Sequence, residues 1–315
     1  MSEIPLHLVP GAEWRVAWLA TDGQGYTEPF FDDTLRRLRR LPANRGGELR
    51  TTPLAALEGV EDREPDLIVF HVSRCGSTLF AQMLAALPQH TVLAEPPLAD
   101  EILRLPRTRA ATTDIERIAW LRGAIASLAR PHATASRRLF VKLDCWHIFD
   151  VPLVRRAFPR TPFIFLHRHP VEVLASLMRQ PSMTLVRDTV LPEQLGLTRA
   201  ERDALTPVEH AAAILGAFFR AAHEHRGQLH AVDYAQLPDF VWQALPGCAF
   251  DAGERASLAA AAQRDAKNPS ANFQPDSARK RAAATPELLA AAERWTLPHY
   301  AAFLAATRGH ANCGA

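Results

Sequence analysis

The strongest constraint on the fold lies between residues 67 and 87, where LIVFHVSRCGSTLFAQMLAAL joins an apolar run to a helical pattern. The run LIVFHV has the composition of a strand covered on both faces. The turn SRCGST that follows brings backbone N–H groups and a helix start around one small volume, which favours an anion. Gly76 lets the backbone approach a ligand, Ser77 and Thr78 offer hydroxyls, and Arg74 adds a positive charge. The alternative is an ordinary strand–helix turn capped by Ser77.

Short apolar runs alternate with helical patterns from residue 65 onward, which predicts an α/β fold with a central parallel sheet flanked by helices. Strands are expected at 66–72, 91–94, 138–143, 162–167 and 228–233. Helices are expected at 77–87, 114–129, 170–178, 207–225, 237–244, 252–263 and 286–306. Residues 1–64 have more Gly, Pro and Thr punctuation, so we expect an N-terminal extension that packs on a main domain of residues 65–315.

Composition excludes several classes of protein. A formal charge of +2 from 36 basic and 34 acidic residues gives no reason to expect a nucleic-acid partner. Four cysteines without a CxxC pair fit a reducing compartment rather than a disulfide framework. We find neither a signal-peptide pattern nor an apolar run of the roughly 18 residues that a membrane span needs. The expectation is a cytoplasmic protein with no membrane span, and its oligomeric state stays open.

A second candidate anion site follows the strand FIFLH at 163–167. Arg168 leaves the carboxyl end of that strand, where open sheets bind ligands. Pro170 starts a helix, and Ser176 lies about two turns further on. Together Arg168 and Ser176 could hold a second phosphate. The alternative makes Arg168 a surface ion-pair residue and Ser176 a small packing residue.

These two motifs in this order resemble the sulfotransferase family, whose donor is 3'-phosphoadenosine 5'-phosphosulfate (PAPS). The resemblance covers roughly residues 66–310, and it implies a P-loop-like fold without the Gly-Lys pair of a nucleotide triphosphatase. In the family, a (K/R)SG(T/S)T loop binds the 5'-phosphosulfate, and an Arg-x-Pro motif with a serine eight residues after the arginine binds the 3'-phosphate. The segment VDYAQLP at 232–238 is a weaker similarity. The cofactor-binding residues that the resemblance implies are Arg74, Cys75, Gly76, Ser77, Thr78, Leu79, Arg168, Ser176 and Lys280.

The resemblance also implies which residues act on the sulfuryl group. Arg74 is the candidate for stabilising the leaving phosphate, and Lys142 matches the lysine of the family's Lys-x-His segment. Asp144 stands where many members have a catalytic histidine. For the general base we rank Glu95 first, Asp144 second and His147 third, and each could instead be a structural residue. A carboxylate base needs a raised pKa, which neighbouring Arg and Lys side chains would oppose.

Some features remain open in the sequence. Lys267 and the basic run Arg279, Lys280 and Arg281 could close the 3'-phosphate site or form a solvated face. No metal site is expected, because the two histidines of HEH at 223–225 would face different sides of a helix. The acceptor could be a small molecule, a lipid or a peptide, bound by the N-terminal extension and by residues 96–115 and 181–206, with VRDTVLPEQLGLTRAERD as a lid.

Three functions therefore compete. The first is a metal-independent, PAPS-dependent sulfotransferase that acts on a hydroxyl or amine and releases 3',5'-ADP. The second is a P-loop small-molecule kinase or nucleotide hydrolase, with LFVKLD at 139–144 as its metal-binding strand, although the missing Gly-Lys pair counts against it. The third is a non-catalytic nucleotide-binding relative.

Overall fold

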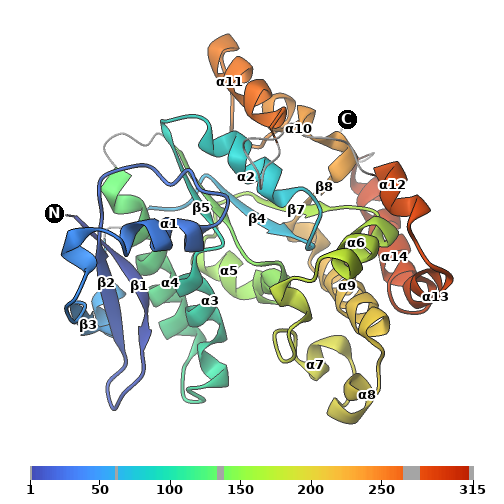
Figure 1. The fold of residues 1–315 in the computed structure, drawn as a ribbon, viewed down its shortest axis with the longest axis horizontal. Coiled ribbons are helices and arrows are strands. Elements are labelled where there is room, and N and C mark those ends of the chain that lie inside the picture. The colour runs from blue at the N-terminus through green and yellow to red at the C-terminus, as the bar shows by residue number, and fades with distance from the viewer. Residues whose placement is uncertain (1, 61–62, 133–137, 265–276, 312–315) are drawn as a thin grey trace.

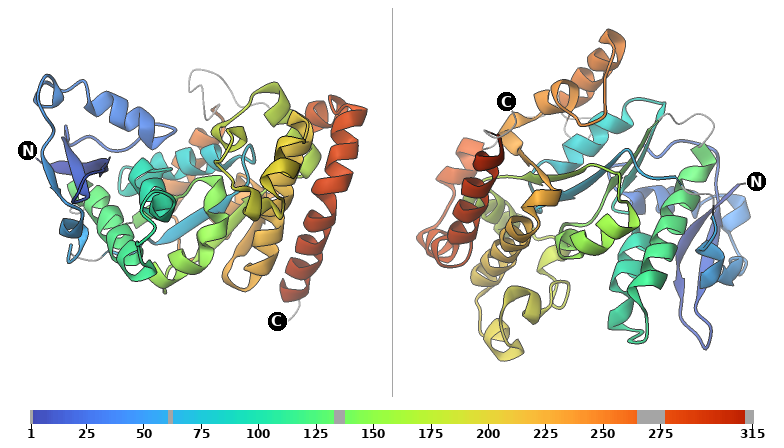
Figure 2. Two further views of the ribbon diagram at one scale, coloured as in Figure 1. Left: turned by 90° about the horizontal axis from the view of Figure 1, so that it is seen from below. Right: turned by 180° about the vertical axis from the view of Figure 1, so that it is seen from behind.

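The computed structural model describes residues 2–60, 63–132, 138–264 and 277–311. Figure 1 shows a five-stranded sheet at the centre, with α2, α10 and α11 on one face and α4, α5 and α9 on the other, an arrangement that the reverse view of Figure 2 repeats. The strands are β1 (Glu3–Val9), β2 (Arg15–Ala20), β3 (Thr51–Pro53), β4 (Leu67–His71), β5 (His90–Ala94), β6 (Arg138–Lys142), β7 (Phe163–His167) and β8 (His230–Asp233). The helices are α1 (Phe31–Leu38), α2 (Ser77–Ala85), α3 (Pro97–Arg104), α4 (Asp114–Ala129), α5 (Val151–Ala157), α6 (Pro170–Arg179), α7 (Pro192–Leu195), α8 (Arg199–Asp203), α9 (Pro207–Glu224), α10 (Asp239–Gln243), α11 (Ala252–Ala262), α12 (Ser277–Ala282), α13 (Pro286–Trp295) and α14 (Leu297–Ala311).

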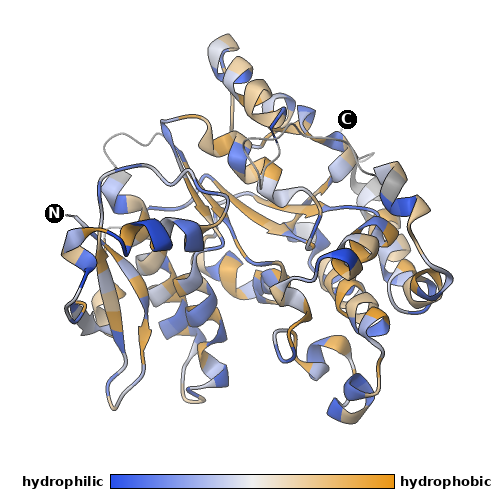
Figure 3. Ribbon diagram, viewed as in Figure 1, coloured by the Kyte–Doolittle hydropathy of each residue, from blue (hydrophilic) through white to orange (hydrophobic). Residues whose placement is uncertain are grey.

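The central sheet has the strand order β5-β6-β4-β7-β8, and its described neighbours pair in parallel. Strands β4 and β7 are buried at every position, which explains their nearly continuous apolar composition. In Figure 3 the strands of the central sheet are largely orange, whereas the helices around them mix blue and orange residues. The α/β fold class is therefore confirmed.

The helix expected at 286–306 is instead two helices. α13 ends at Trp295 and α14 begins at Leu297, with Thr296 between them. The side chain of Thr296 is completely buried and donates from Oγ1 to the Ala212 carbonyl of α9 at 2.7 Å. Helical spacing continues across this break, so the sequence pattern does not reveal the bend.

The N-terminal segment forms a small antiparallel sheet with the strand order β1-β2-β3, and α1 lies next to this sheet. Ile4, Leu19 and Leu57 from this segment are fully buried in the same hydrophobic core as the strands of the central sheet. The Tyr26 hydroxyl also donates to the Leu128 carbonyl of α4 at 2.8 Å. Residues 2–60 therefore pack directly on the α/β sheet's helices.

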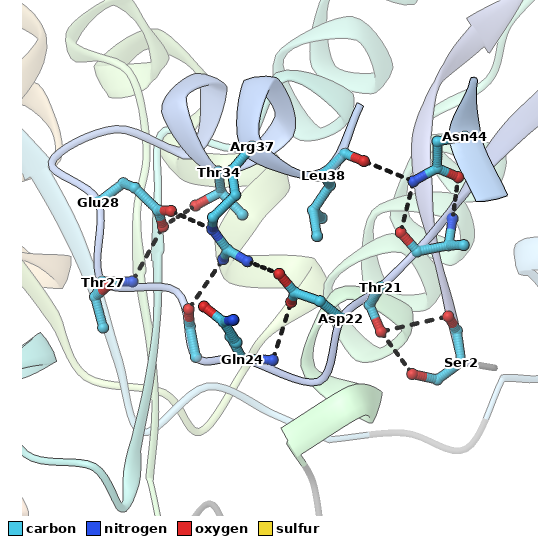
Figure 4. Close-up of polar contacts among 12 residues, drawn as sticks. Ser2, Thr21, Asp22, Gln24, Thr27, Glu28, Thr34, Arg37, Leu38 and Asn44 are labelled. Atoms are coloured by element: carbon cyan, nitrogen blue, oxygen red, sulfur yellow. Dashed lines mark hydrogen bonds and ion pairs between the residues drawn. The ribbon is translucent and has the colours of Figure 1, made fainter. Parts of the chain in front are cut away.

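A polar cluster fixes the position of α1, as Figure 4 shows. Arg37 of α1 donates from Nε to Glu28 at 2.5 Å and pairs with Asp22 through a second guanidinium nitrogen. The side-chain amide of Asn44 donates to the carbonyls of Ala20 and Leu38, which ties α1 to β2. These contacts hold α1 beside the carboxyl edge of the central sheet.

In the part of the chain that the structure describes, no helix combines the length and hydrophobicity needed to cross a membrane. Of the four cysteines, Cys75, Cys145 and Cys248 are free thiols, and Cys313 lies outside the described residues.

The packing of the N-terminal segment can be tested at Gly123. A Cβ atom at Gly123 of α4 would lie 1.8 Å from the backbone oxygen of Leu57. Because both clashing groups are fixed to the backbone, α4 or the segment around Leu57 would have to shift to relieve the overlap. We expect Gly123→Ala to destabilise the protein by about 1–3 kcal/mol in denaturant unfolding. Gly47→Ala is the control, because a Cβ there meets nothing within 4 Å. Equal stability of the two variants would contradict the observed contact between α4 and the segment around Leu57.

Candidate active site

The SRCGST turn (residues 73–78) connects β4 to α2 with an unusual backbone. Arg74 has φ 61° and Gly76 has φ 88°, both in the left-handed region. A Cβ at Gly76 would lie 2.7 Å from the ring of Tyr234, so only glycine satisfies both the conformation and the space. α2 starts directly at Ser77, and the first N–H groups of a helix favour an anion.

The two predicted anion motifs meet at Arg74. Its Nε donates to Oγ of Ser176 on α6 at 2.9 Å, and its Nη2 donates to Oε1 of Gln180 at 2.7 Å. Ser176 is 1 % exposed, so this hydroxyl is held at the contact between the turn and α6. The structure therefore joins the turn after β4 to the helix after β7.

Arg168 lies nearby but has a different set of contacts. It is 4 % exposed, donates from Nε to Glu172 at 2.6 Å and from Nη2 to Ser277 at 2.8 Å, and its guanidinium lies 4.0 Å from the ring centroid of Tyr234. Arg281 donates to the second oxygen of Glu172 at 2.7 Å. Glu172 thus holds two arginines in place. Glu172 is not among the residues predicted from the sequence, although its position four residues after Arg168 at a helix start is a usable signal.

Two further lysines, Lys267 and Lys280, were predicted near the 3'-phosphate, and the structure describes only Lys280. Lys280 on α12 is buried and lines a separate cavity of about 610 Å³ between α6, α9 and α13, together with Arg179 and Glu287. Lys267 lies outside the described residues. The structure therefore does not bring Lys280 to the cavity at the SRCGST turn.

Glu95 and Lys142 form a buried ion pair at the ends of β5 and β6. The Lys142 ammonium is 2.5 Å from Oε1 of Glu95, and its side chain is 2 % exposed. Nε2 of His71 lies 3.4 Å from the same oxygen. Burial opposes ionisation of Glu95, but Lys142 and His71 outweigh it and lower its pKa to about 2. Glu95 is therefore a carboxylate at neutral pH and a weak proton acceptor.

Asp144 follows β6, and its pKa is shifted in the opposite direction from that of Glu95. Burial and the neighbouring charge of Glu95 raise the pKa of Asp144 to about 7. Its closest ion-pair contact among the described residues is Nε2 of His147 at 3.8 Å. A carboxyl group with this pKa exchanges a proton near neutral pH, which is what a general base requires.

His147 is completely buried between carboxylates. Its Nδ1 is 3.0 Å from Asp150 and its Nε2 is 3.1 Å from Asp100. Burial disfavours the charged ring, but these two carboxylates raise the pKa of His147 to about 9. The ligand atoms of Asp100, Asp144 and His147 lie within 4.8 Å of one another, as in a metal site. The contacts among these residues are those of an ion-pair cluster around the His147 ring.

Cys75 and Leu79 complete the predicted turn residues. Both side chains are buried, and burial raises the pKa of the Cys75 thiol to about 12. Cys75 is therefore a neutral side chain at physiological pH, and its contribution to an anion site is the backbone of the turn.

Some of these residues line one cavity of about 440 Å³, whereas Arg168, Ser176, Lys142 and His147 are not among its lining residues. Ser73, Arg74, Ser77 and Thr78 of the turn form one wall, and Glu95, Asp100 and Asp144 form another. Phe30, Asp32, Asp33 and Arg36 close it from the N-terminal segment, and Ser182, Met183 and Thr184 close it from the loop after α6. The segments expected to bind the acceptor thus do contribute to the cavity, although sequence patterns did not single out these N-terminal residues.

The SRCGST turn and Asp144 thus line the same cavity. The model of the sulfotransferase family matches residues 65–239, which is more than half of the chain. The chain belongs to the sulfotransferase family.

Three solved structures to which the chain is similar each share 15 % sequence identity with it. The sulfotransferase domain from the curacin biosynthetic pathway is 15 % identical with a TM-score of 0.39, covering 74 % of this chain and 98 % of that one. A sulfotransferase from Alicyclobacillus acidocaldarius is 15 % identical with a TM-score of 0.40, covering 78 % and 96 %. Sulfotransferase STF9 from Mycobacterium avium is 15 % identical with a TM-score of 0.37, covering 62 % and 67 %. Comparison with curated proteins gives no significant match.

The buried ion pair makes a direct stability prediction. Lys142→Met leaves the Glu95 carboxylate buried without its cation, which we expect to cost about 3–5 kcal/mol in denaturant unfolding at neutral pH. The double variant Glu95→Gln/Lys142→Met removes both charges and should recover most of that loss. A single variant as stable as the wild type would show that the pair contributes nothing.

Proposed function

We propose that this sulfotransferase transfers the sulfuryl group of PAPS to a hydroxyl or amine of an acceptor bound in the 440 Å³ cavity. The observation that carries the proposal is the sharing of one cavity by the SRCGST turn and Asp144. A donor anion on the turn would face a proton acceptor across a space of ligand size.

The donor's two phosphate ends fit two groups of residues. The turn, with the start of α2 and the hydroxyls of Ser77 and Thr78, suits the 5'-phosphosulfate. Arg168 suits the 3'-phosphate because Glu172 and Ser277 already hold its guanidinium in place. Ser176 lies between the two groups, in contact with Arg74.

The reaction needs an in-line nucleophile, a stabilised leaving group and a base. The acceptor oxygen or nitrogen forms a bond to sulfur as the bond from sulfur to the bridging oxygen breaks, and 3',5'-ADP leaves. Arg74, at the turn, is placed to balance the charge that grows on the leaving phosphate. Lys142 lies behind Glu95, where its ammonium fixes the carboxylate and adds positive charge to this end of the cavity.

For the base we propose Asp144 in preference to Glu95, the residue that the sequence ranked first. The ion pair with Lys142 keeps the pKa of Glu95 too low for efficient proton uptake at neutral pH. His147 is already protonated there, because its pKa is raised to about 9. Asp144 takes the acceptor's proton, and Asp100, Asp150 and His147 hold the surrounding charges in place.

Ligand binding tests the donor assignment. We expect 3',5'-ADP to raise the melting temperature more than 5'-AMP or ATP with Mg²⁺, because it alone fills both phosphate sites without a metal. At about 100 times Kd a ligand contributes about 2.7 kcal/mol. Arg168→Ala should abolish the shift, whereas Arg160→Ala should keep it, since Arg160 is exposed and pairs with Glu64. Stabilisation by ATP with Mg²⁺ alone would favour the kinase alternative, and 3',5'-ADP binding without PAPS turnover would favour a non-catalytic role.

The pH dependence of turnover tests the base. The proton-accepting form of Asp144 exists above its pKa, so kcat should rise through a midpoint of about 7 as pH increases. Asp144→Asn should lower kcat by about 10²–10⁴-fold and remove this limb, with 3',5'-ADP binding retained. If Glu95→Gln removed the limb and Asp144→Asn did not, the order of the two carboxylates would be reversed.

A further inference from the structure

The ring of Tyr234 touches both of the groups to which the donor's phosphates are assigned. Tyr234 begins the turn that follows β8, and its side chain is half-buried. The guanidinium carbon of Arg168 lies 4.0 Å from the centroid of the ring. The same ring lies so close to Gly76 that a Cβ atom there would be 2.7 and 2.8 Å from two ring carbons. One side chain therefore contacts both the SRCGST turn and Arg168.

The register of the sheet brings Tyr234 and Arg168 together. In the parallel pair of β7 and β8, His167 is aligned with Asp233. Arg168 and Tyr234 are the next residues along each chain segment, so they leave the sheet at the same level of its carboxyl edge. The contact between the ring and the guanidinium thus follows from the pairing of two adjacent strands.

Short-range hydrogen bonds hold the backbone around Tyr234. The Asp233 carboxylate accepts from the Ala235 N–H at 2.8 Å, and the Gln236 side chain accepts from the Asp233 N–H at 2.7 Å. The Leu237 N–H donates to the Tyr234 carbonyl at 3.0 Å. Because none of these bonds uses the Tyr234 side chain, the ring can be replaced while the turn keeps its hydrogen bonds.

The ring adds a contact to Arg168 that its hydrogen bonds do not provide. The guanidinium donates from Nε to Glu172 on α6 and from Nη2 to Ser277 on α12. Tyr234 contributes an aromatic face from a third element, the turn after β8. Arg168 is only 4 % exposed, and a cation over an aromatic face is most strongly attracted where water is excluded.

The contact at Gly76 involves the start of α2. Gly76 is the N-cap residue of this helix and has φ 88°. The first N–H groups of α2, which suit the 5'-phosphosulfate, follow directly. The ring therefore packs on the backbone where the helix begins, and it relates this helix start to the guanidinium of Arg168.

We propose that Tyr234 is a positioning residue that sets the distance between the two phosphate sites, and that it thereby favours a nucleotide phosphorylated at both its 5' and 3' positions. The inference rests on the proposed donor and names the side chain that matches the protein to the donor's length. Tyr234 acts through Arg168 and Gly76 and takes no part in the chemical step. It is not among the described residues that line the 440 Å³ cavity, so its replacement leaves the lining of the acceptor's cavity in place.

Two nucleotides that differ only in the 3'-phosphate, 3',5'-ADP and 5'-AMP, separate the two sites. In calorimetry on the full chain, we expect Tyr234→Leu to weaken 3',5'-ADP binding by about tenfold and 5'-AMP binding by less than about threefold. Leucine fills space beside Gly76, so the turn still binds the 5'-phosphate. It offers no aromatic face, so Arg168 no longer meets the 3'-phosphate in the correct position.

Two further variants serve as controls. Tyr234→Phe keeps the ring and should keep the affinities for both nucleotides. Trp18→Leu removes an aromatic ring from another arginine, Arg50, whose guanidinium lies 4.8 Å from the ring centroid in the N-terminal sheet, and should change neither affinity. If Tyr234→Leu weakened both nucleotides alike, the ring would act on the nucleoside or on folding, and the positioning role would be overturned.

A stability cycle tests the contact with the turn without any nucleotide. Gly76→Ala should lower the midpoint of denaturant unfolding, because both the positive φ and the Tyr234 ring oppose a Cβ atom. In a Tyr234→Ala background the ring atoms are gone and the next contact is Leu237 Cδ1 at 3.4 Å, so Gly76→Ala should lower the midpoint clearly less. Equal losses in the two backgrounds would show that the ring does not hold the turn, which contradicts the proposal.

The donor assignment and the role of Tyr234 fail in different ways. If the wild-type protein does not bind 3',5'-ADP, the PAPS proposal fails and the role of Tyr234 in nucleotide choice fails with it. If the wild type binds 3',5'-ADP more tightly than 5'-AMP and Tyr234→Leu keeps that preference, the donor assignment stands and the role of Tyr234 alone is wrong.

Discussion

The site depends on one constraint, which is that the carboxyl ends of parallel strands meet at one edge of a sheet. β4 ends before the SRCGST turn, β5 before Glu95, β6 at Lys142 and β7 before Arg168. The register places Ala94 beside Lys142, and the Glu95 backbone N–H donates to the Lys142 carbonyl at 2.7 Å. Residues that follow β4, β5 and β6, among them Arg74, Glu95 and Asp144, therefore reach one cavity without any long loop to position them.

Within that cavity, the surroundings of each carboxyl group determine its chemistry. Glu95 and Asp144 are both largely buried, and burial alone would raise the pKa of each. The difference is Lys142, whose ammonium is bonded to Glu95 and not to Asp144. The ionised Glu95 in turn helps to raise the pKa of Asp144. Lys142, with His71, thus keeps Glu95 ionised at neutral pH and leaves Asp144 able to exchange protons there.

The sequence predicted the central sheet well because its strands are short, apolar runs bounded by turn residues. It predicted the SRCGST turn and the helix after the strand at 163–167 as two separate anion sites, each at the carboxyl end of a parallel strand. It could not predict that Arg74 would bond to Ser176, because that contact depends on side-chain direction across two elements. Nor could it predict that Lys280 would point into a different cavity. The first sixty residues were hardest, because three short antiparallel strands with Gly and Pro between them have no periodicity that distinguishes them from loops.

The cavity is built from two parts of the chain. The segment that matches the sulfotransferase family, residues 65–239, contains the SRCGST turn and Asp144. Phe30, just before α1, and Asp32, on α1, line the same cavity from the N-terminal segment. Arg37 of α1 pairs with Asp22 and Glu28, and none of these contacts involves Asp32. A side chain of α1 that lines the cavity can therefore change without loss of the contacts that fix the helix.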